Sequence, residues 1–201
     1  MQKASLARLS AALALAIAAL GAALFLTPWG RSLWSKDGET AIGQALIGGP
    51  FHLIDQNGKP RTDADFRGQY MLVYFGYTSC PDVCPTTLQA ITNAMGKLGA
   101  DAAKVTPIFI TVDPQRDTPD VLKAYASNFD PRLVALTGSA AEIAAAAKAY
   151  RVYYAKVGSG ADYSMDHSSI VYLMGPDGKY LGHFGMDATA ADIAAGIRAL
   201  L

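Results

Sequence analysis

The chain has 201 residues, of which 51% are hydrophobic, and its 17 acidic and 17 basic side chains balance. This balance gives no sign of nucleic acid as a partner, and two cysteines are too few for a disulfide-stapled scaffold. The length predicts one domain with a small appendage.

Residues 1–34 predict a membrane anchor. Lys3 and Arg8 precede an uncharged run over residues 9–26, which spans roughly 27 Å as a helix at about 1.5 Å per residue. That length approaches a bilayer core of roughly 30 Å and exceeds a secretory h-region of about 7–15 residues. We therefore expect one transmembrane helix with a short cytoplasmic start, in a bacterial inner membrane, and the remainder in the periplasm. A cleaved signal peptide is the alternative; it also places the cysteines outside the cytoplasm.

Strand and helix patterns alternate through the rest of the chain. Residues 35–48 are polar and glycine-rich and predict a linker, followed by a domain over residues 49–201. Alternating strands and helices that end in a hairpin and a helix predict an α/β sandwich with a central mixed sheet. Strands are expected at 51–55, 70–77, 105–113 and 132–136, with two more within 168–184, and helices at 86–99, 120–129, 139–150 and 189–201. Residues 155–164 are expected to form an exposed loop.

Helix caps support these boundaries. Thr118 is expected to cap the second helix with Pro119 at its first position, and Ser139 with Glu142 forms a capping box for the third. Thr189 is expected to cap the last helix.

The stretch "YFGYTSCPDVCPTT", residues 74–87, holds both cysteines, Cys80 and Cys84. They follow a strand expected to be buried on both faces, at the rim where open α/β sheets place ligands and catalytic groups. If helical turns begin near Pro81, residues four apart share a face, and the helix start stabilises thiolates there.

Three uses of the pair compete. A structural disulfide would close a loop of only a few residues and gain little stability. A redox-active disulfide between Cys80 and Cys84 is the second use, and a soft-metal site is the third. Copper(I) accepts few ligands, so two sulfurs and one imidazole would suffice. Of the three histidines, His52 and His183 have strand contexts, whereas His167 lies in polar company where a loop meets a strand.

Three separated motifs together resemble the Sco/SenC family of membrane-anchored copper chaperones. They are "FGYTSCPDVCPTTL", "TVDPQRDTP" and "YSMDHSSIVYLMGPDGKYLGHF", and the resemblance covers roughly residues 45–200. It implies a thioredoxin-like fold, and copper held by Cys80, Cys84 and His167 as Cu(I) or Cu(II). It also implies a role in maturing the dinuclear copper centre of cytochrome c oxidase subunit II, or of a related copper acceptor.

The same resemblance implies further residues and a rival activity. Asp113 is carried over as a residue near the site, and Asp166 is a candidate for orienting the imidazole of His167. Gln115 stands where the usual motif has glutamate, which removes a charge from the loop. A metal carrier is favoured over an enzyme. The alternative is a thiol:disulfide oxidoreductase that keeps the acceptor's cysteines reduced, and copper loading would itself need a reductant, such as another thioredoxin-like protein.

Overall fold

The computed structural model describes residues 46–160 and 162–201. The anchor expected over residues 1–34, and residues 35–45 of the expected linker, lie outside the described part of the chain. Within the described part, no helix combines the length and the apolar character that crossing a membrane requires.

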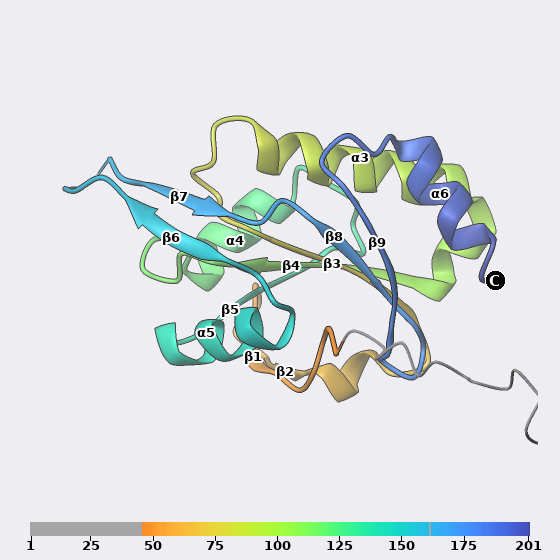
Figure 1. Cartoon of the computed structure of the whole chain (residues 1–201), viewed down its shortest axis with the longest axis horizontal. Helices are drawn as coiled ribbons and strands as arrows, with labels where there is room; N and C mark the ends of the chain where they lie inside the picture. The colour runs from red at the N-terminus through yellow and green to blue at the C-terminus, as the bar shows by residue number, and fades with distance from the viewer. Residues whose placement is uncertain (1–45, 161) are drawn as a thin grey trace, which may run out of the picture. The chain divides into compact units, whose positions relative to one another are not determined.

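A seven-stranded mixed sheet runs through the domain (Figure 1). Its strands are β1 (His52–Asp55), β2 (Pro60–Thr62), β3 (Tyr70–Gly76), β4 (Val105–Thr111), β5 (Val134–Thr137), β8 (Val171–Met174) and β9 (Tyr180–Phe184). Their spatial order is β2-β1-β5-β4-β3-β8-β9. β3, β4 and β5 are parallel neighbours, and the other pairs are antiparallel. The expected α/β fold with a central mixed sheet is therefore confirmed.

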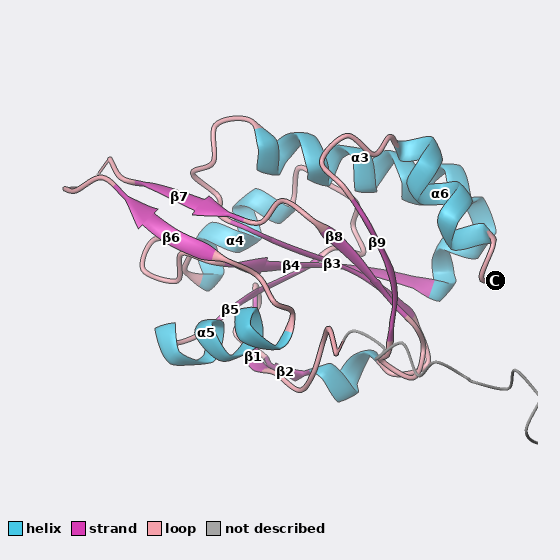
Figure 2. Cartoon of the chain, in the orientation of Figure 1, coloured by secondary structure: helices cyan, strands magenta, loops and turns pink. Residues whose placement is uncertain are grey.

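Helices cover both faces of this sheet (Figure 2). The helices are α3 (Val83–Leu98), α4 (Pro119–Ala126), α5 (Ala140–Ala149) and α6 (Ala190–Arg198), with short 3-10 helices η1 (Asp63–Phe66) and η2 (Gly99–Lys104). α3 and α6 lie together on one face, and α5 lies on the opposite face.

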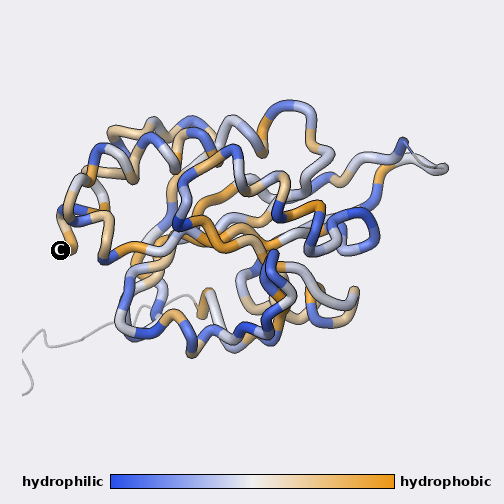
Figure 3. The backbone as a smooth tube through the Cα atoms, turned by 180° about the vertical axis from the view of Figure 1, so that it is seen from behind, coloured by the Kyte–Doolittle hydropathy of each residue, from blue (hydrophilic) through white to orange (hydrophobic). Residues whose placement is uncertain are grey.

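The core lies on both sides of β3, as its unbroken apolar sequence predicts. Tyr74 meets Phe109 of β4 at 6.2 Å between ring centroids, whereas Phe75 meets Tyr150 at the end of α5 at 5.4 Å. Successive β3 side chains therefore fill opposite layers. The apolar central strands stand out against the polar outer loops (Figure 3). The apolar stripe on α3 is buried as its spacing predicts; it comprises Leu88, Ile91, Met95 and Leu98.

The predicted caps are confirmed at three helix starts. The Thr118 side chain accepts a hydrogen bond from the backbone N–H of Val121, with Pro119 opening α4. Capping boxes begin α5 at Ser139 and α6 at Thr189. Each cap of this kind stabilises a helix by about 1 kcal/mol, so these boundaries are encoded locally.

The loop expected over residues 155–164 is only partly right: residues 158–160 and 162–163 lie outside regular structure, whereas both ends of the segment are strands. β6 (Tyr154–Val157) and β7 (Ser164–His167) form a separate antiparallel hairpin that extends beyond the large sheet (Figure 1). The polar, glycine-rich sequence hid it because, of the apolar side chains on its strands, Tyr154 and Met165 pack against the core, too few for a clear apolar pattern. Backbone pairing, with Tyr154 opposite His167, also holds the hairpin together.

The start of the described chain packs on the domain. Ile47 contacts the core, and the backbone N–H of Gly48 donates to the carbonyl of Ala149 at 3.0 Å. Gly48 has φ +90°, and a Cβ there would meet the end of the Met174 side chain. Glycine is therefore required where the linker reaches the domain.

Candidate metal centre

The two cysteines lie where β3 gives way to α3. The helix begins at Val83, with Asp82 as its N-cap, so Cys84 occupies the first turn and Cys80 lies in the preceding loop. The backbone N–H of Cys84 donates to Cys80 Sγ at 3.4 Å. Both cysteines are free, Cys80 half-buried and Cys84 fully buried. The helix start is two residues later than Pro81, yet the sulfurs still converge.

His167 reaches the cysteines through the sheet topology. β8 runs antiparallel to β3, with Val171 opposite Tyr74. Residues just before β8 therefore lie beside those just after β3. The ligand atoms of Cys80, Cys84 and His167 all lie within 4.8 Å of one another.

The geometry suits a shared metal ion. Cys84 Sγ and His167 Nε2 are 3.4 Å apart. Metal bonds of about 2.3 Å to sulfur and 2.0 Å to nitrogen, at angles between tetrahedral and trigonal, would separate the sulfur from the nitrogen by roughly 3.5–3.7 Å. His167 Nδ1 lies 3.2 Å from the Ser168 carbonyl oxygen. A carbonyl only accepts, so Nδ1 carries the proton and Nε2 presents its lone pair to the sulfurs.

Aromatic rings hold the imidazole in place. The rings of Tyr74 and Tyr77 meet the His167 ring edge-on, with centroids 6.2 and 5.9 Å away. Both tyrosines are buried, which shields this side of the site from water. Burial also raises the pKa of Tyr74 far above its ordinary value, so its side chain remains a neutral hydroxyl.

The two thiols differ in acidity. Burial raises the pKa of Cys84 to about 12. Burial also opposes ionisation of Cys80, but the backbone N–H groups of Asp82 and Cys84 outweigh it, and the pKa of Cys80 is lowered. For His167, burial lowers the pKa against the raising effects of the Ser168 carbonyl and Asp166, so the ring is neutral and able to ligate.

Asp113 links the hairpin to the cysteine loop without joining the ligand cluster. It is buried, accepts a hydrogen bond from the Tyr163 hydroxyl at 2.7 Å, and pairs with the Arg116 guanidinium. That guanidinium lies 3.7 Å from the Tyr163 ring centroid and 5.7 Å from that of Tyr77. Because Tyr77 contacts His167, Asp113 is connected to the imidazole through the side chains of Arg116 and Tyr77.

Asp166 is exposed and accepts no hydrogen bond from the imidazole, whose Nδ1 faces the Ser168 carbonyl instead. Its carboxylate acts on His167 only through its charge, which raises the pKa of the ring.

Asp117 holds the cysteine loop, and sequence reasoning missed it. Its carboxylate is fully buried and accepts hydrogen bonds from the Thr78 N–H at 3.0 Å, the Thr78 hydroxyl at 2.5 Å and the Thr111 hydroxyl at 2.6 Å. Burial raises the pKa of Asp117 despite these donors. The second aspartate of "DPQRDTP" is an ordinary turn residue by sequence, so only the fold reveals its contact with Thr78, two residues before Cys80.

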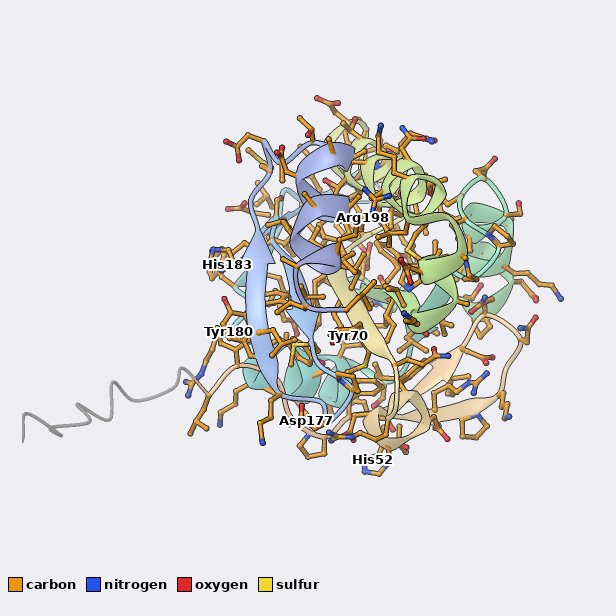
Figure 4. The ribbon with its side chains drawn as sticks, turned by 90° about the vertical axis from the view of Figure 1, so that its right-hand side faces the viewer. His52, Tyr70, Asp177, Tyr180, His183 and Arg198 are labelled. Atoms are coloured by element: carbon orange, nitrogen blue, oxygen red, sulfur yellow. The ribbon has the colours of Figure 1, made fainter. Side chains whose placement is uncertain are left out.

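The other two histidines lie apart from the cluster. His52 is exposed on β1, and His183 is exposed on β9, where its Nδ1 is 2.6 Å from the Tyr180 hydroxyl. Figure 4 shows His52 and His183 at the periphery of the domain.

Comparison with known proteins decides the family. The family model described as SCO1/SenC matches residues 39–201. The chain belongs to the SCO1/SenC family. This chain is 44% identical to the mouse protein SCO1 homolog, mitochondrial, over 168 residues, which cover 82% of this chain and 59% of the mouse protein. The chain therefore matches well under two thirds of that relative's length.

Solved structures of Sco proteins share the fold. The structure of Bradyrhizobium japonicum ScoI with copper bound has a TM-score of 0.72 and 49% identity, covering 77% of this chain and 99% of that one. BsSco, a member of the Sco family of cytochrome c oxidase assembly proteins with an identified disulfide switch, has a TM-score of 0.62 and 30% identity, covering 78% of this chain and 95% of its own. The thioredoxin-like, mixed-sheet domain is thus the Sco fold.

Proposed function

We propose that this protein binds copper through Cys80, Cys84 and His167 and delivers it to the dinuclear copper centre of cytochrome c oxidase subunit II. The observation that carries the proposal is the convergence of these three ligand atoms within 4.8 Å. Two sulfurs and one imidazole form a soft donor set suited to Cu(I). Membership of the SCO1/SenC family and the copper-bound Bradyrhizobium relative support the choice of metal, and the relative BsSco, from a family of cytochrome c oxidase assembly proteins, supports the role in oxidase assembly.

Copper is the cargo, and the site suits transfer. Three protein ligands leave room for a donor atom from the acceptor, so copper can pass by ligand exchange with no electron moved. Cys80 is half-buried, whereas Cys84 is fully enclosed, so Cys80 is the ligand nearer to solvent and to a partner. We expect Cys80 to be the first ligand released.

The location proposed for this chemistry is the periplasmic face of a bacterial inner membrane, with residues 1–34 as the anchor. Thiolates bind soft copper and a disulfide does not, so an extracytoplasmic site needs a reductant before loading. A thioredoxin-like protein is the kind of partner that would supply it.

A second candidate function is reduction of the acceptor's cysteines. The observations that favour it are two free, adjacent thiols of unequal acidity and the disulfide switch identified in BsSco. The Cys80 thiolate would attack an acceptor disulfide and form a mixed disulfide. Cys84 would then displace the acceptor thiol. The acceptor gains two electrons, and this chain keeps a Cys80–Cys84 disulfide.

His167→Ala separates the two functions, with His52→Ala as the matched control because that imidazole is exposed and outside the cluster. Full-length reduced protein is titrated with Cu(I) against a chromogenic chelator, and dithiol exchange is measured on a model disulfide. We expect His167→Ala to lose most of its Cu(I) affinity and keep its exchange activity, while His52→Ala keeps both. If His167→Ala binds Cu(I) as tightly as the parent, the proposed copper-carrier function is refuted.

A further inference from the structure

The hydroxyl of Tyr74 is a polar group with no evident structural purpose. It is fully buried in the middle of the sheet, and among the described residues it has no hydrogen-bond partner. A buried donor left unpaired costs about 1–3 kcal/mol, so each such group calls for an explanation. Phenylalanine would fill the same space without that cost.

The hydroxyl belongs to a ring that packs against the metal ligands. An ideal Cβ built on Gly76 would lie 3.0 Å from Cys84 Sγ and 3.3 Å from Tyr74 Cε1, so the sulfur and the ring edge border the same small space. The same ring lies edge-on to His167, with centroids 6.2 Å apart.

The ligand set creates a demand that this donor can meet. Two thiolates, one Cu(I) and one neutral imidazole carry a net charge of −1 in a buried site, and a buried charge needs hydrogen-bond donors. Cys80 Sγ accepts the Cys84 N–H at 3.4 Å. Cys84 Sγ is more deeply buried, and its neighbour at 3.4 Å is His167 Nε2, which carries no proton when Nδ1 does and so cannot donate.

We propose that Tyr74 is a positioning residue of the metal centre, whose hydroxyl donates a hydrogen bond to the Cys84 sulfur when that sulfur is a metal-bound thiolate. The inference rests on the proposed function, because only a thiolate ligand offers the hydroxyl a charged acceptor in place of none. Hydrogen bonds to a copper-bound sulfur tune the reduction potential of the metal and strengthen its binding.

Tyr74→Phe tests the role, with Tyr172→Phe as the matched control. Tyr172 is equally a buried tyrosine, on the adjacent strand β8, but its ring packs against Tyr150 in the opposite layer of the core. In full-length protein we expect Tyr74→Phe to bind Cu(I) about 10- to 100-fold more weakly, as loss of an outer hydrogen bond does in other metal sites. In the Cu(II) form, its sulfur-to-copper charge-transfer band should move to lower energy. Tyr172→Phe should match the parent in both measurements.

Metal-free stability separates positioning from simple packing. Because the hydroxyl has no partner without metal, Tyr74→Phe should unfold at the same or a higher urea concentration than the parent. An unchanged affinity and band in Tyr74→Phe would overturn the inference while leaving the copper site intact. An affinity loss in Tyr74→Phe that is accompanied by lower metal-free stability would also overturn the inference. The same holds if the affinity is lost in Tyr125→Phe instead, which removes the other buried tyrosine hydroxyl without a partner among the described residues. A parent that binds no copper would instead refute the proposed function itself.

Discussion

Gly76→Ala tests whether the end of β3 is shaped around the Cys84 sulfur. An ideal Cβ on this residue would lie 2.8 Å from Phe109 Cε2, 3.0 Å from Cys84 Sγ and 3.3 Å from Tyr74 Cε1. Ordinary carbon contacts are about 3.5–4.0 Å, so neighbours must shift by several tenths of an ångström. Phe109, Cys84 and Tyr74 are all fully buried and have no open space to enter.

The expected cost follows from this crowding. Overpacking of a core costs about 1–3 kcal/mol, from which the entropic gain of replacing glycine, about 0.4–1 kcal/mol, is subtracted. We therefore expect Gly76→Ala to lower the free energy of unfolding by roughly 1–2 kcal/mol, which lowers Tm by about 2–4 °C per kcal/mol in a chain of this size. Because Cys84 Sγ is one of the displaced atoms, Cu(I) affinity should fall as well.

Gly182→Ala is the control, because it is also a strand glycine but a Cβ there meets nothing within 4 Å. Urea unfolding of the reduced, metal-free protein and a Cu(I) competition titration are measured on both variants and the parent. Gly182→Ala should equal or slightly exceed the parent in stability and match its affinity. If Gly76→Ala is as stable as Gly182→Ala and binds copper as tightly, the end of β3 is not closely packed around the Cys84 sulfur and the reasoning is refuted.

Three further predictions concern charge and the cysteine loop. Iodoacetamide at neutral pH should label Cys80 before Cys84 in the reduced, metal-free protein, because the pKa of Cys80 is lowered and that of Cys84 is raised to about 12; peptide mass mapping showing Cys84 labelled first would contradict this. Asp117→Ala leaves the part-buried Thr78 and the buried Thr111 donors without their acceptor and should cost about 2–4 kcal/mol in urea unfolding; a parental midpoint would refute its role. Burial of Asp55 favours its protonated form, but hydrogen bonds from the Lys59 N–H and the Arg61 side chain outweigh this effect and lower the pKa of the carboxyl below 3.8. A lowered folded-state pKa contributes stability above the unfolded value, and that stability is lost as pH falls below about 4. The difference in stability between the parent and Asp55→Asn should therefore shrink in acid, and a constant difference from pH 7 to pH 3 would count against this.

Local patterns were sufficient for most of the fold. The caps at Thr118, Ser139 and Thr189 and the apolar run of β3 each depend on a few neighbouring residues, so they can be predicted without knowing the tertiary structure. The β6–β7 hairpin could not, because it depends on long-range contacts: the pairing of Tyr154 with His167 and the packing of Met165 against the core.

The residues of the metal site also differ in how far local sequence patterns predict them. Cys80 and Cys84 are close in sequence, so their proximity follows from four-residue spacing at a helix start. His167 lies beside them only because β8 pairs antiparallel with β3, a long-range register that the motif resemblance implied but local patterns do not contain. Tyr74 gave no signal at all, since a tyrosine in a buried strand is ordinarily a packing residue.

X-ray absorption at the copper edge of the Cu(I)-loaded, reduced, full-length protein tests the central claim most directly. We predict two sulfur scatterers and one imidazole nitrogen around each copper ion, from Cys80, Cys84 and His167. A copper ion surrounded by sulfur alone, or with the same nitrogen signal remaining in His167→Ala, would contradict the site described above.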